Sequence, residues 1–207
     1  NDHAAVLDTV TDAYLNSYIE QCVEEICTIN PRWLGISVFT FQCQIFTHKL
    51  LQRLRPQFAN KIVIGGAGIS SSGIGAESND FGNWLLKTNY IDYYIRGEGD
   101  LNIINLLKNN TEQPGINNDQ VLQIDNLDDV PLPNYDDVID LPYQYTTEYP
   151  QLPITGSRGC VRKCSFCYIH IAWKKYRYRS GKSVAEEFAH HYERYGTTNF
   201  WFTDSLI

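Results

Sequence analysis

Three cysteines stand close together near the end of the sequence, at Cys160, Cys164 and Cys167. This C-x3-C-x2-C spacing allows one loop to direct three thiolates toward one face of a compact inorganic centre. Three protein ligands on a four-iron cluster leave the fourth iron open. An open position distinguishes a catalytic metal centre from a closed structural one. Gly156 and Gly159 precede the first cysteine and allow a tight backbone turn. The spacing therefore favours a catalytic iron–sulfur centre.

A structural zinc site is the alternative for the same three thiolates, with a fourth ligand such as His170. Structural zinc sites usually use paired C-x2-C knuckles, and only one such pair is present here. The other cysteines, Cys22, Cys27 and Cys43, lie in apolar patterns. We expect them to be buried as small hydrophobic side chains.

The cysteine segment resembles the cluster loop of the radical S-adenosylmethionine (radical-SAM) enzymes, C-x3-C-x-aromatic-C, in which Phe166 takes the aromatic position. Ser157-Arg158-Gly159 is similar to a common lead-in of that loop. The resemblance implies that Cys160, Cys164 and Cys167 bind a [4Fe–4S] cluster and that S-adenosylmethionine chelates the fourth iron. It also implies reductive cleavage of S-adenosylmethionine to a 5′-deoxyadenosyl radical, with Phe166 bordering the adenine.

The elements around the cysteine loop are those expected at the start of a (β/α) barrel. A short strand at 152–155 leads into the loop, a capping box at Ser183–Glu186 starts a helix that ends at Gly196, and a strand follows at 200–203. Active sites of such barrels lie at the carboxyl ends of the strands, where the cysteine loop and Asp204 fall. The segment around Asp204 is also similar to the second-strand ending of radical-SAM enzymes, so Asp204 is expected to bind a cofactor.

The first part of the chain alternates helices with strands, which predicts an α/β fold with a doubly wound, flavodoxin-like parallel sheet. Helices are expected at 11–29, 42–58, 80–87 and 101–108, and strands at 33–40, 61–64 and 90–95. Ligands bind at the carboxyl ends of the strands in such sheets. Thr40 and the glycine clusters at 65–68 and 97–99 fall there.

This order of elements resembles the cobalamin-binding domain found upstream of many radical-SAM barrels. Ser37-Val38-Phe39 is similar to its Ser-x-Leu motif, Gly65-Gly66 to its Gly-Gly motif, and Gly97-Glu98-Gly99-Asp100 to a turn common in these chains. The Asp-x-His-x-x-Gly motif is absent, so either its strand lies upstream or cobalt is bound without that histidine. The resemblance implies cobalamin contacts at Ser37, Thr40, Gly65, Gly66, Gly97, Glu98 and Gly99.

Three segments follow from these patterns. Residues 1–110 are expected to form the cobalamin-binding-like domain, 111–151 an acidic, proline-stiffened linker, and 152–207 the start of a truncated barrel. The chain contains no methionine and stops directly after a strand-like run, which suggests a fragment of a longer protein.

Composition sets the expected compartment and partners. No apolar run could span a bilayer and no signal-peptide pattern is present, so six cysteines indicate reduced thiols in a cytoplasmic setting. The first 155 residues carry eight Lys and Arg against 20 Asp and Glu, whereas the remainder carries nine against four. The basic residues around the cysteine loop are Arg158, Arg162, Lys163, Lys174, Lys175, Arg177, Arg179 and Lys182.

The favoured function is a radical-SAM enzyme that performs cobalamin-dependent methyl transfer or a rearrangement on a small-molecule substrate. A flavodoxin or ferredoxin is expected as electron donor, and neither a membrane nor nucleic acid as partner. Two alternatives stay open. The basic residues would suit a radical-SAM methylthiotransferase that acts on tRNA. A zinc-stabilised binding module without catalytic activity would use the same cysteines.

Overall fold

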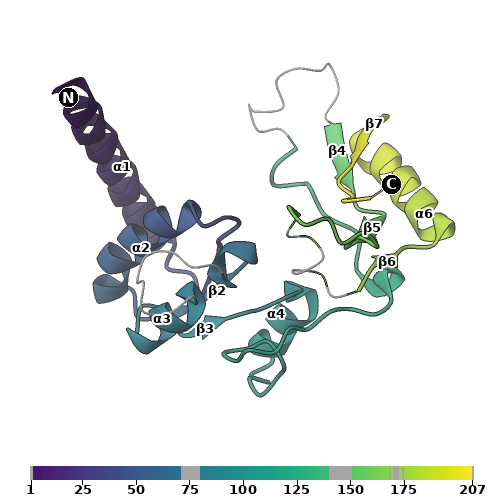
Figure 1. Ribbon diagram of the computed structural model, residues 1–207, viewed down its shortest axis with the longest axis horizontal. Coiled ribbons are helices and arrows are strands. Elements are labelled where there is room, and N and C mark those ends of the chain that lie inside the picture. The colour runs from purple at the N-terminus through teal and green to yellow at the C-terminus, as the bar shows by residue number, and fades with distance from the viewer. Residues whose placement is uncertain are drawn as a thin grey trace. The chain divides into compact units, whose positions relative to one another are not determined.

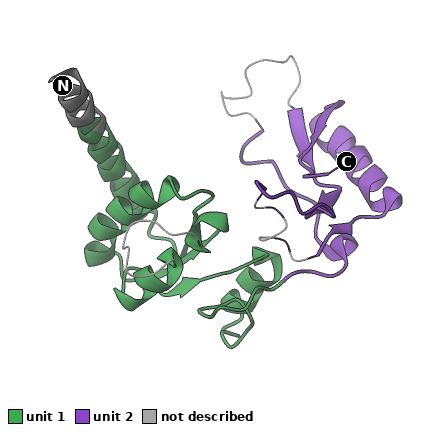
Figure 2. Cartoon of the chain, in the orientation of Figure 1, with its two compact units in different colours: residues 1–122 green, residues 123–207 purple. Residues whose placement is uncertain are grey.

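The chain is described by a computed structural model that covers residues 2–70, 80–139, 151–167, 169, 173 and 175–206. For residues 2–11 only the backbone is described. The chain divides into two compact units, residues 1–122 and 123–207 (Figures 1 and 2). No helix among the described residues is both long enough and apolar enough to cross a membrane.

The first unit is a mixed α/β structure around a parallel sheet of three strands, in the order β1-β2-β3. Its strands are β1 (Trp33–Ser37), β2 (Lys61–Gly65) and β3 (Tyr93–Tyr94). Its helices are α1 (Asp2–Ile29), α2 (Cys43–Leu54), α3 (Phe81–Lys87) and α4 (Gly99–Leu107), with the short 3-10 helices η1 (Arg55–Gln57) and η2 (Ala67–Ser70). The predicted α/β class and parallel sheet are thus confirmed for this unit.

Helices cover both faces of this sheet. On one face, α1, α2 and α3 bury Ile19, Leu51 and Leu85 against Ile62 and Ile64 of β2. The opposite face is covered by α4, whose buried Leu106 joins a smaller cluster with Val63 and Ile95. Because strand side chains alternate between the two faces, β2 contributes to both clusters and reads as a continuous apolar run.

Helix α1 is longer than the pattern of apolar residues predicted. It begins at Asp2 rather than near residue 11. It ends at Ile29, and the next residue, Asn30, adopts a left-handed conformation with φ 46°. Its two tyrosines in the predicted apolar stripe, Tyr14 and Tyr18, are exposed. The three cysteines of this unit are only partly buried, although each packs against the main core cluster.

Part of the segment predicted as a linker belongs to the first unit. Residues 113–118 form a turn beside β3, and Leu122 makes an isolated parallel bridge with Gly97. Asn117, in a left-handed conformation, binds the outer edge of β3 with three hydrogen bonds. Its side-chain oxygen accepts from the Tyr94 amide at 2.8 Å, its side-chain nitrogen donates to the Asp92 carbonyl at 3.2 Å, and its own amide donates to the Tyr94 carbonyl at 3.1 Å.

The second unit contains a parallel strand pair connected by a helix. Strand β4 (Gln151–Ile154) pairs in parallel with β7 (Asn199–Phe202), and α6 (Gly181–Tyr195) connects them. Two further short strands, β5 (Ser157–Arg158) and β6 (Arg177–Tyr178), pair antiparallel. The short 3-10 helix η3 (Leu127–Asp129) precedes them. The strand, helix and strand were predicted in this order from the sequence.

The predicted start of α6 is wrong by three residues. The capping residue is Ser180, whose hydroxyl accepts a hydrogen bond from the Ser183 amide at 3.1 Å. Ser183 thus lies inside the first turn, and its hydroxyl contacts the Arg179 guanidinium instead of capping. The predicted end is confirmed, because Gly196 takes the left-handed conformation that closes many helices.

The segment before β4 is bound along α6. Asp128 accepts from the Ser180 amide at 2.9 Å, and Asp136 forms a two-point ion pair with Arg194. Between them, the Tyr135 amide donates to the Tyr195 hydroxyl at 2.8 Å. Several aspartates of this acidic segment therefore bind specific donors of the same unit.

A buried polar cluster stabilises the packing of α6. Arg179 forms an ion pair with Glu187, and both side chains are almost completely buried. Next to this pair, the fully buried His191 has its Nε2 3.4 Å from Glu187 Oε1, and neither ring nitrogen makes a hydrogen bond among the described residues. Burial lowers the pKa of His191, although the Glu187 carboxylate favours the charged imidazole.

Gly66 provides a direct test of the contact between β2 and the turn after β1. Its φ is +102°, and a Cβ there would lie 2.5 Å from the Val38 carbonyl oxygen. Gly66→Ala is expected to lower the free energy of unfolding by about 2 kcal/mol or more. Gly35→Ala is the matched control, because no atom lies within 4 Å of a Cβ at Gly35. Urea unfolding followed by circular dichroism measures both; equal stability of the two variants would contradict the described contact.

We expect the second unit to lose stability in mild acid because of the buried His191. Because its pKa is lowered in the folded state, the unfolded chain takes up a proton below about pH 6.5 that the folded chain does not. Stability is therefore complete above that pH and falls as the pH decreases toward the folded-state pKa. Hydrogen exchange of α6 amides at pH 7.5 and 5.5, corrected for intrinsic rates, measures this effect. His191→Leu should reduce the difference between the two pH values, and an unchanged difference would refute the assignment.

Candidate functional site

The cysteine loop begins at the carboxyl end of a parallel strand. Strand β4 ends at Ile154, and the chain passes through Gly156 and the short strand β5 before it reaches Cys160. Strand β7 runs parallel to β4, so Asp204, two residues beyond its end, lies at the same edge. The structure thus brings together the loop base and Asp204, which the sequence predicted to share this edge.

Gly159 turns the chain into the first cysteine. Its φ is +94°, and a Cβ at this position would lie 2.7 Å from the Lys175 carbonyl oxygen and 3.2 Å from Trp173 Cβ. No residue with a side chain fits both constraints without strain. The predicted need for glycine just before Cys160 is therefore confirmed by the backbone conformation.

The three cysteines carry free thiols and are partly exposed, so none is consumed by a disulfide. The Cys167 amide donates to the Cys164 carbonyl at 3.1 Å, which closes a tight turn between the second and third cysteine. The Arg162 amide points to Cys160 Sγ at 3.4 Å. Amide–sulfur contacts of this kind are among the factors that set cluster potentials.

Whether the cysteine loop binds a cluster or a single metal ion stays a prediction for the described residues. Within them, no three His, Cys, Asp or Glu side chains converge on one metal ion. Zinc needs all its thiolates about 2.3 Å from one centre. A [4Fe–4S] cluster binds each cysteine through a different iron and so requires wider spacing. His170, the suggested fourth zinc ligand, lies outside the described residues.

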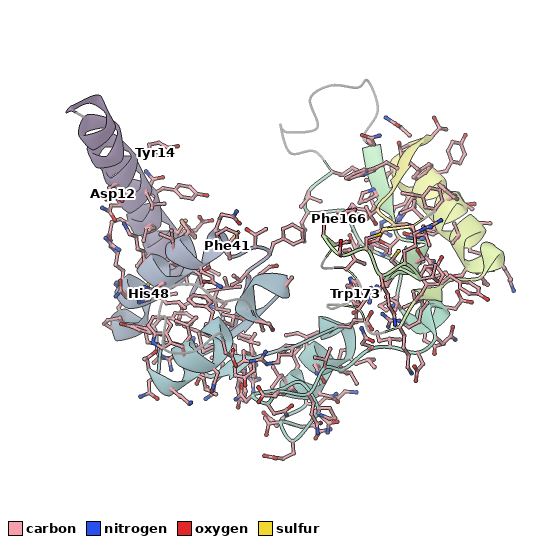
Figure 3. The ribbon with its side chains drawn as sticks, viewed as in Figure 1. Asp12, Tyr14, Phe41, His48, Phe166 and Trp173 are labelled. Carbon is pink, nitrogen blue, oxygen red and sulfur yellow. The ribbon has the colours of Figure 1, made fainter. Side chains whose placement is uncertain are left out.

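Phe166 and Asp204 are the two further predicted contacts in this unit. Phe166 is 90% exposed at the turn between the second and third cysteine (Figure 3). Its ring is therefore available to a planar ligand, and its contact with adenine stays a prediction. Asp204 is partly buried, and its carboxylate accepts hydrogen bonds from the Gly156 amide at 2.9 Å and from the Ser157 hydroxyl.

Several basic residues around the loop have partners in the same unit. Arg177 donates to the Ile124 carbonyl and lies over the Trp173 ring at 5.6 Å. Lys175 pairs with Asp125 at 2.8 Å. Arg179 and Lys182 pair with glutamates of α6. The contacts of Lys175, Arg177 and Arg179 join the segment that follows the cysteines to other parts of the unit. Lys182 and Glu186 form an exposed pair within α6.

The first unit contains a pocket at the carboxyl ends of its strands, with a volume of about 420 Å³. It is lined by five of the predicted cobalamin contacts, Ser37, Gly65, Gly66, Gly97 and Gly99. The apolar side chains that line it come from all three strand regions and from α4, and they are Ile36, Val63, Ile64, Ile95 and Ile103. The small residues at the strand ends thus leave space on the sheet face that larger side chains would fill.

Two predicted contacts do not line this pocket. The Thr40 hydroxyl lies 3.5 Å from Cys43 Sγ at the start of α2, and this hydrogen bond lowers the pKa of the Cys43 thiol. Glu98 is buried at the start of α4. Gly97 does line the pocket, and its φ of +80° brings the chain close to the Leu122 carbonyl, where a Cβ would lie at 2.3 Å.

Sequence reasoning missed Gly35 and Asp100 as pocket residues. Gly35 lies two positions before Ser37 in β1, so both face the same side of the sheet. The alternation of side chains along β1 therefore predicts that Gly35 faces the same space as Ser37. His48 of α2 packs its ring against Trp84 and Tyr90, and burial lowers its pKa.

Comparison with known proteins shows a likeness of fold. No family model and no curated protein matches the sequence. Two solved structures of the radical S-adenosylmethionine methyltransferase TsrM from Kitasatospora setae are similar. The first, with tryptophan substrate and the analogue aza-SAM bound, has a TM-score of 0.61 at 19% identity. The second, with cobalamin and a [4Fe–4S] cluster bound, has a TM-score of 0.60 at 17% identity.

Each comparison covers 89% of this chain but 39% of the TsrM chain, so the chain spans about two fifths of the length of these neighbours. At this level of identity the likeness concerns the fold. The described chain is therefore a mixed α/β protein whose fold is similar to part of a radical-SAM methyltransferase.

Proposed function

We propose that this chain is the cofactor-binding part of a radical-SAM enzyme, with Cys160, Cys164 and Cys167 as ligands of a [4Fe–4S] cluster. The observation that carries this proposal is the placement of three free thiols on one loop at the carboxyl end of β4. The fold likeness to TsrM over most of the chain supports it.

When bound, the cluster would supply the electron that cleaves S-adenosylmethionine to a 5′-deoxyadenosyl radical. The chain's own residues position that chemistry. Gly159 turns the backbone so that Cys160 follows directly after the sheet edge. The amide of Arg162 lies 3.4 Å from Cys160 Sγ. The exposed Phe166 ring offers an apolar surface for the adenine.

The pocket of the first unit is proposed to bind part of cobalamin, which would make methyl transfer the favoured reaction. Its glycines and Ser37 are the residues that resemble cobalamin-binding motifs, and they line one space next to the sheet. No histidine lines this pocket, so cobalt would be bound without a histidine ligand from the described residues. A small-molecule substrate and a flavodoxin or ferredoxin donor complete the proposal.

The cluster proposal is tested by Cys164→Ala. Without one of three thiolates the loop is expected to lose the cluster, and with it the formation of 5′-deoxyadenosine. Iron and sulfide analysis after anaerobic reconstitution measures the loss. Cys27→Ala is the matched control, since Cys27 is a partly buried cysteine of α1. Full iron and sulfide content in Cys164→Ala would reject the assignment, and zinc in the purified wild type would favour the binding-module alternative.

The cobalamin proposal is tested by Gly35→Leu. Because no atom lies within 4 Å of a Cβ at Gly35, a leucine would occupy the pocket without disturbing the sheet. We expect hydroxocobalamin binding to weaken about tenfold or more. Corrinoid absorbance retained after desalting measures the effect. Gly181→Leu is the matched control, because Gly181 lies in the other unit and also has free space. Absence of retained absorbance in the wild type would reject cobalamin binding.

A further inference from the structure

We infer that Asp204 is a positioning residue for the cysteine loop. Its carboxylate binds the first two residues after Thr155 and so determines how the chain leaves β4 toward Cys160. This inference rests on the proposed function of the loop as a cluster site. We call the hydrogen bonds of Asp204 with Gly156 and Ser157 the clamp. They join protein groups only, so they can be measured in the metal-free chain.

The two oxygens of the Asp204 carboxylate bind different donors. Oδ2 accepts from the Gly156 amide at 2.9 Å, and Oδ1 accepts from the Ser157 hydroxyl. Ser157 is only 5% exposed, so these contacts are shielded from water. Hydrogen bonds to a charged acceptor are stronger than those between neutral groups. One side chain at the end of β7 therefore holds both the backbone and the side chain of the loop base.

A second segment of the unit binds the same residue, Gly156, through its carbonyl group. The Arg179 amide, next to β6, donates to the Gly156 carbonyl at 2.8 Å. The Arg179 side chain is itself fixed by the buried ion pair with Glu187 and by the Thr155 carbonyl at 3.3 Å. The amide and carbonyl of Gly156 are thus bound by two different segments, which leaves the loop base little freedom to rotate.

The space at Gly156 supports a close fit of the carboxylate. A Cβ there would lie 3.3 Å from Asp204 Oδ1 and 3.4 Å from Phe202 Cε1. The backbone of Gly156 is not in the left-handed region, in contrast to Gly159. Glycine at 156 is therefore explained by the approach of the Asp204 side chain and Phe202, and not by a turn that only glycine can make.

The strand ends next to this clamp are also fastened to each other. The hydroxyls of Thr155 and Thr203 lie 2.8 Å apart, and the Thr203 amide donates to the Ile154 carbonyl at 2.9 Å. Asp204 follows directly after Thr203, so its position is fixed by the pairing of β4 and β7. A rigid attachment four residues before Cys160 limits where the first thiolate can lie.

The first experiment measures amide exchange in the metal-free protein. In Asp204→Ala the Gly156 amide loses its acceptor, and its exchange is expected to become about tenfold faster or more. Asp204→Asn retains one acceptor oxygen and should give an intermediate rate. Asp137→Ala is the matched control, because Asp137 is an exposed aspartate of the same unit. Unchanged exchange in Asp204→Ala would overturn the clamp.

The second experiment asks whether the clamp positions the cluster. After anaerobic reconstitution, the reduced Asp204→Ala protein should show an altered electron paramagnetic resonance spectrum and less iron per chain, and Asp204→Asn should partly restore both. Faster exchange with a wild-type spectrum would overturn the positioning role. If the wild type binds no iron and sulfide, the cluster assignment is wrong. The amide-exchange experiment still tests whether Asp204 binds the Gly156 amide.

Ser157→Ala gives an independent check that preserves the carboxylate. This variant removes the hydroxyl contact but keeps the bond between Asp204 and the Gly156 amide. A smaller change in the same direction as Asp204→Ala is expected in both experiments. If the Asp204→Ala protein does not fold, Ser157→Ala and Asp204→Asn test the positioning role of Asp204. Wild-type behaviour of both variants would refute the inference.

Discussion

Parallel pairing of short strands is the constraint on which both candidate sites depend. In each unit the strands end at a common edge, so strand pairing brings residues distant in sequence together there. Ser37 lies opposite Gly65 in the register of β1 and β2, and Ile154 lies opposite Phe202 in β4 and β7. The pocket and the cysteine loop both begin within a few residues of these pairs. Any loss of register would displace the ligand-facing residues together.

Close backbone approach is the second requirement, and it is met at a few glycines. At Gly66, Gly97 and Gly159 a side chain would collide with a neighbouring carbonyl oxygen, and each has a positive φ. The clamp at Gly156 differs, because the approaching group is a side chain that carries charge. Glycine is therefore favoured for two different physical reasons at two nearby positions, Gly156 and Gly159.

Much of the fold could be predicted from periodicity, and the reasons for the failures are specific. Strands β1 and β2 were located closely because their apolar runs are bounded by Asn30-Pro31 and by glycines. The start of α6 was missed because Ser180 and Ser183 offer equivalent hydroxyls, and only the backbone geometry selects Ser180. Residues 113–122 were assigned to the predicted 111–151 linker, because isolated β-bridges leave no periodic pattern in a sequence.

The candidate sites also combine features that could be predicted from the sequence with features that could not. Strand-end glycines and the cysteine spacing are local signals, and the structure brings the glycines together in one pocket. The partner of Asp204 could not be predicted, because the contact with Gly156 joins positions 48 residues apart. Thr40 was expected there because it follows a predicted strand, and Glu98 because its turn resembles one common in the family. Neither residue lines the pocket.

The contact of Asn117 with β3 has a consequence for association between molecules. A side-chain amide presents the same donor and acceptor as a peptide group, so one residue here occupies the bonding positions that a whole neighbouring strand would use. Exposed strand edges invite pairing with other chains. Asn117 occupies the hydrogen-bonding groups at this edge of β3 and thereby suppresses pairing of β3 with a strand of another molecule. One asparagine in the left-handed conformation is sufficient for this.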